Sequence, residues 1–221
     1  MNTVKLIYLC ALMFVLAGCD AAPSVQAGDV AATSGAVTGP ATAGVSDSHA
    51  FATFAGGCFW CMEPPYDELP GVISTTSGYT GGHADNPDYK QVTAGGTGHY
   101  ESVQIVYDPT LVTYETLIDI YWINVDPLDA GGQFCDRGNS YRTAIFVHDK
   151  QQREIAVETR SAVAARFATV IATQVIDATE FYPAEEYHQD YYQKNPIRYT
   201  YYRRGCRRDA RLAQLWGPGE H

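Results

Sequence analysis

The chain has 221 residues, of which 46% are hydrophobic and 18% are charged, a balance typical of one globular domain with appended segments. Its formal net charge of −10 argues against a nucleic-acid partner, because phosphate binding requires clustered lysine and arginine side chains. The arginines that do cluster lie near the end of the chain and fit either a solvated helix face or a docking surface: Arg203, Arg204, Arg207, Arg208 and Arg211.

The first segment has the features of a targeting signal. Lys5 is followed by an apolar run over residues 6–17, which is shorter than the about 20 apolar residues of a membrane span but suits the core of a signal peptide. The run ends in Leu16-Ala17-Gly18-Cys19, which resembles a bacterial lipobox. We therefore expect residues 1–18 to be removed and Cys19 to carry lipid. The alternative is an uncleaved signal anchor with an incidental cysteine.

A flexible linker is predicted over residues 19–49, where Ala, Gly, Ser, Thr and Val dominate and no helical or strand period is visible. The folded domain is then 50–221. This organisation predicts a membrane-anchored lipoprotein that lies outside the cytoplasm, in the periplasm. After processing, four thiols remain: Cys58, Cys61, Cys135 and Cys206.

Short strands and helices alternate along the folded part. Strands are predicted over residues 50–55, 72–79, 101–107, 142–148 and 170–176. Helices are predicted over residues 58–69, 113–124 and 150–167, and loops over 84–98 and 126–140. Pro64-Pro65 must lie in the first turn of its helix or break it. The pattern predicts a layered α/β or α+β domain with one sheet, without fixing the strand order.

Cys58 lies at the corner between the first strand and the first helix, directly after Gly56-Gly57. The unpaired N–H groups and positive end of a helix at that point would favour a thiolate and lower the pKa of the thiol. Glycine also lets backbone and substrate approach the sulfur closely. A buried structural cysteine is the alternative.

Phe59 and Trp60 follow this cysteine and have two interpretations. Aromatic side chains beside a helix start usually pack in the core. Directly after a nucleophile, they could instead form an apolar wall for a small uncharged group, such as a methyl on sulfur.

Several motifs together resemble, in the same order, the A class of peptide methionine sulfoxide reductases. The resemblance covers about residues 50–217. Its motifs are Gly56-Gly57-Cys58-Phe59-Trp60 with Glu63, Ser77-Gly78-Tyr79-Thr80-Gly81-Gly82, Gly96-Thr97-Gly98-His99-Tyr100-Glu101, Asp126-Pro127, Asp136-Arg137-Gly138-Asn139-Ser140-Tyr141-Arg142, Phe181-Tyr182-Pro183-Ala184-Glu185, Tyr187-His188-Gln189 and Lys194-Asn195-Pro196.

The resemblance implies a two-layer α/β sandwich with a mixed sheet and a ferredoxin-like core, with extended loops and a C-terminal tail. It implies an enzyme, a monomer without bound cofactor or metal, that reduces the S epimer of methionine sulfoxide, free or in oxidised proteins. Thioredoxin or a thioredoxin-like dithiol protein would be the co-substrate. Because cytoplasmic thioredoxin cannot reach a periplasmic site, we expect an extracytoplasmic donor.

The resemblance also implies residue roles. Glu101 matches the acid that protonates the sulfoxide oxygen, a role that requires a raised pKa in an apolar setting. Tyr89 and Tyr141 match tyrosines that bind this oxygen, and Asp136 matches a residue that binds the backbone side of the substrate. Attack by Cys58 would leave a sulfenic acid, which a second thiol condenses to a disulfide.

The second thiol is open among three cysteines. Cys206 ranks first, because its Tyr-Arg-Arg-Gly-Cys context resembles a subgroup with a recycling cysteine near the C-terminus. Cys61 ranks second, since residues three apart on a regular helix have Cβ atoms about 5–6 Å apart, beyond the roughly 3.5–4.5 Å of a disulfide. Cys135 ranks third.

Three other functions compete with this one. A general disulfide oxidoreductase would use Cys58 and Cys61 as a C-x-x-C pair, but would leave Glu101 without a task. A zinc module could use four thiols, yet Cys135 and Cys206 lack the spacing of a second zinc knuckle. A membrane-displayed binding protein has no binding signature in the sequence.

Overall fold

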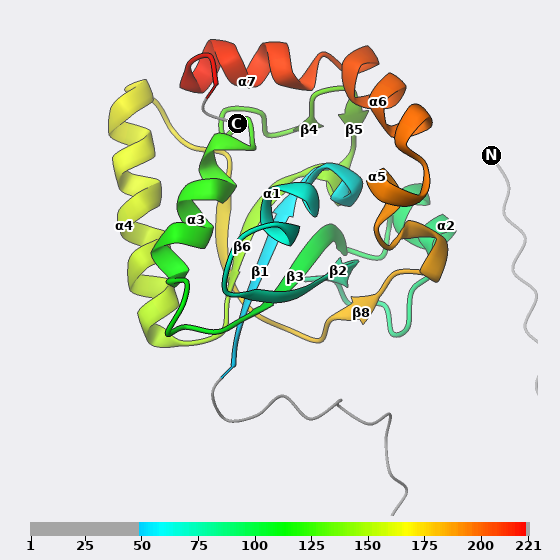
Figure 1. The fold of residues 1–221 in the computed structure, drawn as a ribbon, viewed down its shortest axis with the longest axis horizontal. Coiled ribbons are helices and arrows are strands. Elements are labelled where there is room, and N and C mark those ends of the chain that lie inside the picture. The colour runs from blue at the N-terminus through cyan, green and yellow to red at the C-terminus, as the bar shows by residue number, and fades with distance from the viewer. Residues whose placement is uncertain (1–48, 220–221) are drawn as a thin grey trace, which may run out of the picture. The chain divides into compact units, whose positions relative to one another are not determined.

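The computed structural model describes residues 49–219 (Figure 1). The predicted signal peptide 1–18, the lipidation site Cys19 and nearly all of the linker 19–49 lie outside these residues. Across 49–219, none of the helices combines the length and apolar character that a membrane crossing requires.

One six-stranded sheet forms the centre of the domain, in the order β7-β6-β1-β3-β2-β8. Only β6 and β7 are parallel, so the sheet is mixed and the predicted α/β class is confirmed. The strands are β1 (Ala50–Gly56), β2 (Val72–Thr80), β3 (Tyr100–Tyr107), β6 (Thr143–Val147), β7 (Gln174–Asp177) and β8 (Tyr182–Pro183).

The alternation of strand side chains divides the core between the two faces of the sheet. Phe54, Ile105 and Ile145 belong to the main core, together with side chains of α3 (Tyr114–Ile123), α4 (Lys150–Phe167) and α7 (Arg208–Trp216). Side chains that point to the opposite face of β1, β3 and β6 form a smaller cluster: Ala55, Tyr100, Ala144 and Phe146. Both clusters include side chains of β1, so this strand is packed on both of its faces.

The prediction of one continuous helix over residues 58–69 is wrong. A 3₁₀ turn, η1 (Phe59–Cys61), is followed by the four-residue helix α1 (Pro64–Asp67). Proline lacks an N–H and can occupy only the first turn of a helix, so Pro64-Pro65 starts a new helix and prevents one continuous helix from Cys58.

The two predicted loops contain short elements. Helix α2 (Tyr89–Ala94) begins with a capping box, in which Asp88 accepts a hydrogen bond from the Gln91 backbone while the Gln91 side chain accepts one from the Asp88 backbone. Residues 126–140 include the strands β4 (Gly132–Gln133) and β5 (Asp136–Arg137), and a 3₁₀ turn follows as η2 (Asn139–Tyr141). The strand predicted over 170–176 begins only at Gln174.

The C-terminal tail is folded and largely helical, as Figure 1 shows in orange and red. After β8 it forms η3 (Glu186–His188), α5 (Tyr191–Lys194), α6 (Pro196–Gly205) and α7. The arginine cluster is therefore divided. Arg208 is buried and donates hydrogen bonds to the carbonyls of Gly56 (3.3 Å) and Asn124 (2.7 Å). Arg203 pairs with Asp209 and Arg211 with Asp126, whereas Arg204 and Arg207 are exposed.

Candidate active site

Two glycines shape the corner that presents Cys58. A Cβ on Gly56 would lie 2.4 Å from Sδ of Met62, and a Cβ on Gly57 would lie 2.5 Å from Cβ of Gln133. Gly57 also has φ +81°, which L side chains rarely adopt. The chain can therefore turn sharply out of β1 only with glycine here, and this turn places Cys58 at the start of η1.

The predicted site residues converge on one pocket, although they come from distant parts of the sequence. Its lining consists of Cys58, Phe59, Trp60, Tyr89, Glu101, Asp136, Tyr141 and Tyr202. Seven of these eight were predicted; Cys206 does not line the pocket. Tyr202 was missed, because it lies in a tyrosine-rich helix without a motif that distinguishes it from Tyr199 or Tyr201.

Glu101 projects from β3 and is almost completely buried, with 1% of its surface exposed. Its Oε2 accepts a hydrogen bond from the backbone N–H of Phe59 at 3.3 Å. Burial raises the pKa of this carboxyl group to about 8, and the hydrogen bond from Phe59 only partly offsets the effect. The expected elevation of the Glu101 pKa is thus present, and the group can hold a proton near neutral pH.

Cys58 and Cys61 form a buried pair of free thiols, with exposures of 6% and 1%. Burial raises the pKa of Cys58, and the neighbouring Cys61 raises it further. The pKa of Cys61 is lowered to about 6 by the hydrogen bond from Cys58 and by the positive charges of Arg208 and Arg203. The expected lowering of the Cys58 pKa is therefore wrong, because η1 is a single turn with little helix dipole.

Trp60 is held in place from three sides. Its ring stacks on Tyr191 with a centroid distance of 3.7 Å and an interplanar angle of 7°, and Tyr202 lies edge-on to it. Its Nε1 donates a hydrogen bond to Nδ1 of His188 at 3.0 Å. Phe59, by contrast, is fully buried and packs against the His188 ring. Each ring packs in the domain and also lines the pocket.

Tyr89 and Tyr141 bring two hydroxyl groups to the same pocket. Tyr89 is the first residue of α2, and its backbone N–H donates to Oε1 of Glu185 at 3.0 Å. Burial raises the pKa of Tyr89 to about 12, and burial together with the nearby Glu101 raises that of Tyr141. Both hydroxyls therefore stay protonated and can donate hydrogen bonds to an oxygen in the pocket.

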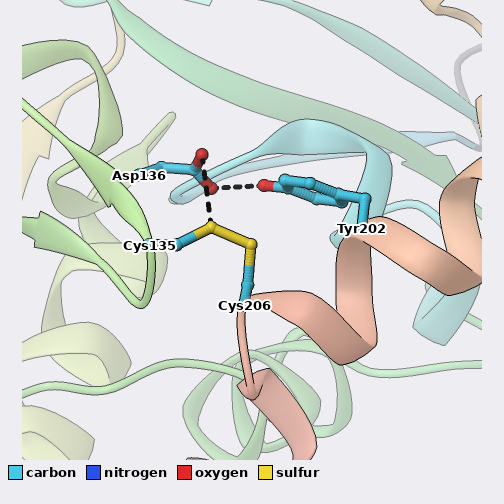
Figure 2. The surroundings of a disulfide bond; sticks show 4 residues. All are labelled: Cys135, Asp136, Tyr202 and Cys206. Carbon is cyan, nitrogen blue, oxygen red and sulfur yellow. Dashed lines mark hydrogen bonds between the residues drawn. A yellow bond between two sulfur atoms is a disulfide. The ribbon is translucent and has the colours of Figure 1, made fainter.

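A disulfide joins Cys135 to Cys206 beside this pocket (Figure 2). The hydroxyl of Tyr202 donates a hydrogen bond to Oδ2 of Asp136, next to Cys135. Cys135 is exposed and Cys206 is partly exposed, in contrast to the buried thiols. The structure thus bonds Cys206, ranked first as the partner of Cys58, to Cys135, ranked third. The free thiol in contact with Cys58 is Cys61.

The described part of the chain contains no assembled metal-binding site. Within residues 49–219, no three or more His, Cys, Asp or Glu side chains are grouped so that they could hold a metal ion.

Comparison with known proteins assigns the family. The sequence model of the family described as Peptide methionine sulfoxide reductase matches residues 50–219. The chain belongs to this family. The predicted enzyme class, a peptide-methionine (S)-S-oxide reductase, is confirmed with it.

Individual relatives agree with this assignment. The chain is 53% identical over 175 residues to the Peptide methionine sulfoxide reductase MsrA of Bacillus licheniformis, covering 78% of this chain and 97% of the relative. Its structure is similar to Mxr1 from Saccharomyces cerevisiae in reduced form, with a TM-score of 0.64, 31% identity and coverage of 68% and 87% of the two chains. It is also similar to methionine sulfoxide reductase A of Corynebacterium diphtheriae, with a TM-score of 0.62, 34% identity and coverage of 69% and 77%.

Proposed function

We propose that this reductase acts on the S epimer of methionine sulfoxide, free or in oxidised proteins, with Cys58 as the nucleophile and Glu101 as the acid. The observation that carries the proposal is the single pocket in which Cys58 faces a buried carboxyl group with a pKa of about 8. A sulfoxide needs both partners at once, because its sulfur is attacked while its oxygen acquires a proton.

In the first step, Cys58 transfers its proton to the Cys61 thiolate and attacks the sulfoxide sulfur. Glu101 gives its proton to the oxygen, while Tyr89 and Tyr141 donate hydrogen bonds to it. The oxygen is transferred to Cys58, which becomes a sulfenic acid, and the substrate leaves as methionine. Sulfoxide sulfur gains two electrons and the sulfur of Cys58 loses two.

In the second step, the thiol in contact with Cys58 attacks its sulfenic sulfur. Cys61 forms a disulfide with Cys58, and water leaves. We call Cys58 and Cys61 the inner pair, and Cys135 and Cys206 the outer pair. Exchange with reduced Cys135 and Cys206 then returns the inner pair to thiols and oxidises the outer pair to a disulfide. Arg203 and Arg208 support this route, since both flank Cys206 in the sequence and both lie close enough to Cys61 to lower its pKa.

The remaining steps concern the reductant and the location. A thioredoxin-like dithiol protein would reopen the Cys135–Cys206 disulfide. The signal-peptide pattern of 1–18 and the lipobox cysteine Cys19 support a membrane-anchored protein in the periplasm, supplied by an extracytoplasmic donor.

A general C-x-x-C disulfide oxidoreductase is the second candidate, because Cys58 and Cys61 are in contact. This function would not require the buried carboxyl group of Glu101. If it were the main activity, Glu101→Gln would leave disulfide exchange with model substrates unchanged while Cys61→Ser abolished it.

A single-turnover experiment tests the proposal. Fully reduced protein, freed of reductant, is mixed with each epimer of methionine sulfoxide, and released methionine is counted. We expect methionine from the S epimer in stoichiometric amount, almost none from the R epimer, and none from Cys58→Ser with either. Equal yields from the two epimers, or an active Cys58→Ser protein, would contradict the proposal.

A further inference from the structure

Helix α6 presents a partly apolar stripe to solvent instead of to the core. Ile197 is 87% exposed and Tyr201 is 82% exposed. Thr200 and Arg204 lie on the same side, since residues at positions i, i+3, i+4 and i+7 share one face of a helix. We call this set, Ile197, Thr200, Tyr201 and Arg204, the α6 stripe. Large exposed apolar side chains grouped in this way are typical of interaction surfaces.

The surface around the α6 stripe is hollowed and basic. Two adjoining depressions flank Tyr201, one reaching Gly205 and the other reaching Lys194. Three exposed arginines lie along this segment, Arg198, Arg204 and Arg207, and none forms an ion pair with a carboxylate of residues 49–219. The whole chain has a net charge of −10, so this local positive surface suits a partner with an acidic face.

The α6 stripe ends close to the outer disulfide along the chain. Cys206 is the C-terminal cap of α6, two residues after Arg204, and it is bonded to the exposed Cys135 (Figure 2). A protein thiol that attacks this disulfide must bring its sulfur into line with one of the two sulfur atoms. It therefore has to rest on the surface beside Cys206. The buried Cys58 and Cys61 offer no comparable access.

We propose that the α6 stripe is the docking surface of the dithiol protein that reduces Cys135–Cys206, an inference that rests on the proposed function. The partner has an exposed nucleophilic cysteine in an apolar surface with acidic residues around it. Its thiolate attacks Cys206, which forms a mixed disulfide and releases Cys135 as a thiol. The second thiol of the partner then attacks the mixed disulfide, leaving Cys206 reduced and the partner oxidised, so two electrons pass to the enzyme.

Two charge-introducing variants, Ile197→Asp and Tyr201→Asp, test this surface, with Val170→Asp as the matched control because Val170 is 85% exposed outside α6. Turnover is measured with thioredoxin, its reductase and NADPH, and separately with dithiothreitol. We expect KM for thioredoxin to rise about tenfold or more in the stripe variants, with the dithiothreitol-driven rate within about twofold of wild type. Val170→Asp should change neither. An unchanged KM for thioredoxin, or equal losses with both reductants, would overturn the docking proposal.

A second readout does not depend on sulfoxide chemistry. Thioredoxin that lacks its second active-site cysteine traps the mixed disulfide, which peptide mapping can assign to a cysteine. We expect it on Cys206, formed more slowly by the stripe variants and more slowly at high salt, which screens the arginines. Trapping at equal rates in wild type and variants would refute docking at the α6 stripe. Absence of methionine release from wild type with dithiothreitol would instead be a failure of the proposed function.

Discussion

The two cysteine pairs of this reductase differ in almost every physical respect. Cys58 and Cys61 are three positions apart, reduced and buried, and Cys58 lines the pocket. Cys135 and Cys206 are 71 positions apart, oxidised and accessible from outside. Attack on a sulfoxide with protonation of its oxygen benefits from a site that excludes water, whereas exchange with a protein requires an accessible sulfur. The difference supports our proposal that substrate reduction and recycling occur at separate places.

The two pairs are nevertheless joined through Asp136 and Tyr202. Asp136 follows Cys135 and lines the pocket, and Tyr202 lines the pocket from the helix that Cys206 caps. The hydrogen bond between Asp136 and Tyr202 therefore connects the inner pair with the outer disulfide.

Replacing the nucleophile should separate the two pairs most clearly. We expect Cys58→Ser to lower single-turnover sulfoxide reduction by roughly 10⁴-fold or more, because no other side chain can replace the attacking sulfur. Cys135→Ser should release methionine in the first turnover at the wild-type rate. Rapid-quench measurement of methionine distinguishes them, and a comparable first-turnover defect in Cys135→Ser would place the outer pair in the substrate step.

Replacing Glu101 tests its proposed role as the acid in the pocket beside Cys58. Glu101→Gln keeps an acceptor for the Phe59 N–H but has no proton to give, so we expect kcat to fall by about 10²–10⁴-fold. In wild type, the raised pKa of about 8 keeps Glu101 protonated below that pH, so the rate should decline as the pH rises through about 8. The Gln variant should lack this decline. A wild-type decline that persists in Glu101→Gln would assign it to another group.

The outer disulfide should contribute mainly to stability in its oxidised form. It closes a long loop between β5 and the junction of α6 and α7, so reduction should lower the free energy of unfolding by about 2–4 kcal/mol. Urea unfolding of wild type with and without dithiothreitol measures the difference. Cys135→Ser should match reduced wild type in both conditions. A variant as stable as the oxidised protein would show that the disulfide does not constrain the fold.

The contact between the pairs should have the smallest effect. Tyr202→Phe removes one hydrogen bond to Asp136 while retaining the ring against Trp60. Loss of one hydrogen bond to a charged group costs about 1.5–3 kcal/mol at most, so we expect kcat to fall by no more than about 150-fold. Stopped-flow kinetics with dithiothreitol tests this value, and a loss as large as that of Glu101→Gln would make Tyr202 part of the proton-transfer machinery.

Much of the inner site could be predicted from the sequence, because local motifs determine it. The Gly-Gly-Cys corner and the strand that carries Glu101 both follow from residues next to one another in the chain. Pro64-Pro65 is the sequence signal for the broken helix after Cys58, and the capping-box pair Asp88 and Gln91 is the signal for α2.

The outer pair could not be predicted in the same way. Four cysteines allow three pairings, and only the folded chain brings Cys135 and Cys206 to a Cα–Cα distance of 5.0 Å. The same is true of Tyr202 and of the buried Arg208, whose partners Gly56 and Asn124 are distant in the sequence. Sequence motifs identified most of the pocket lining, and long-range packing determines the pairing of Cys135 with Cys206.

Redox mapping after one turnover tests the separation of the two pairs most directly. All four thiols are reduced, one equivalent of the S epimer is added without reductant, and the thiols are blocked and mapped by mass spectrometry. We expect a transient Cys58–Cys61 disulfide followed by Cys135–Cys206, with Cys58 and Cys61 returning to thiols. A stable Cys58–Cys206 disulfide with Cys135 left as a thiol would contradict transfer between an inner and an outer pair.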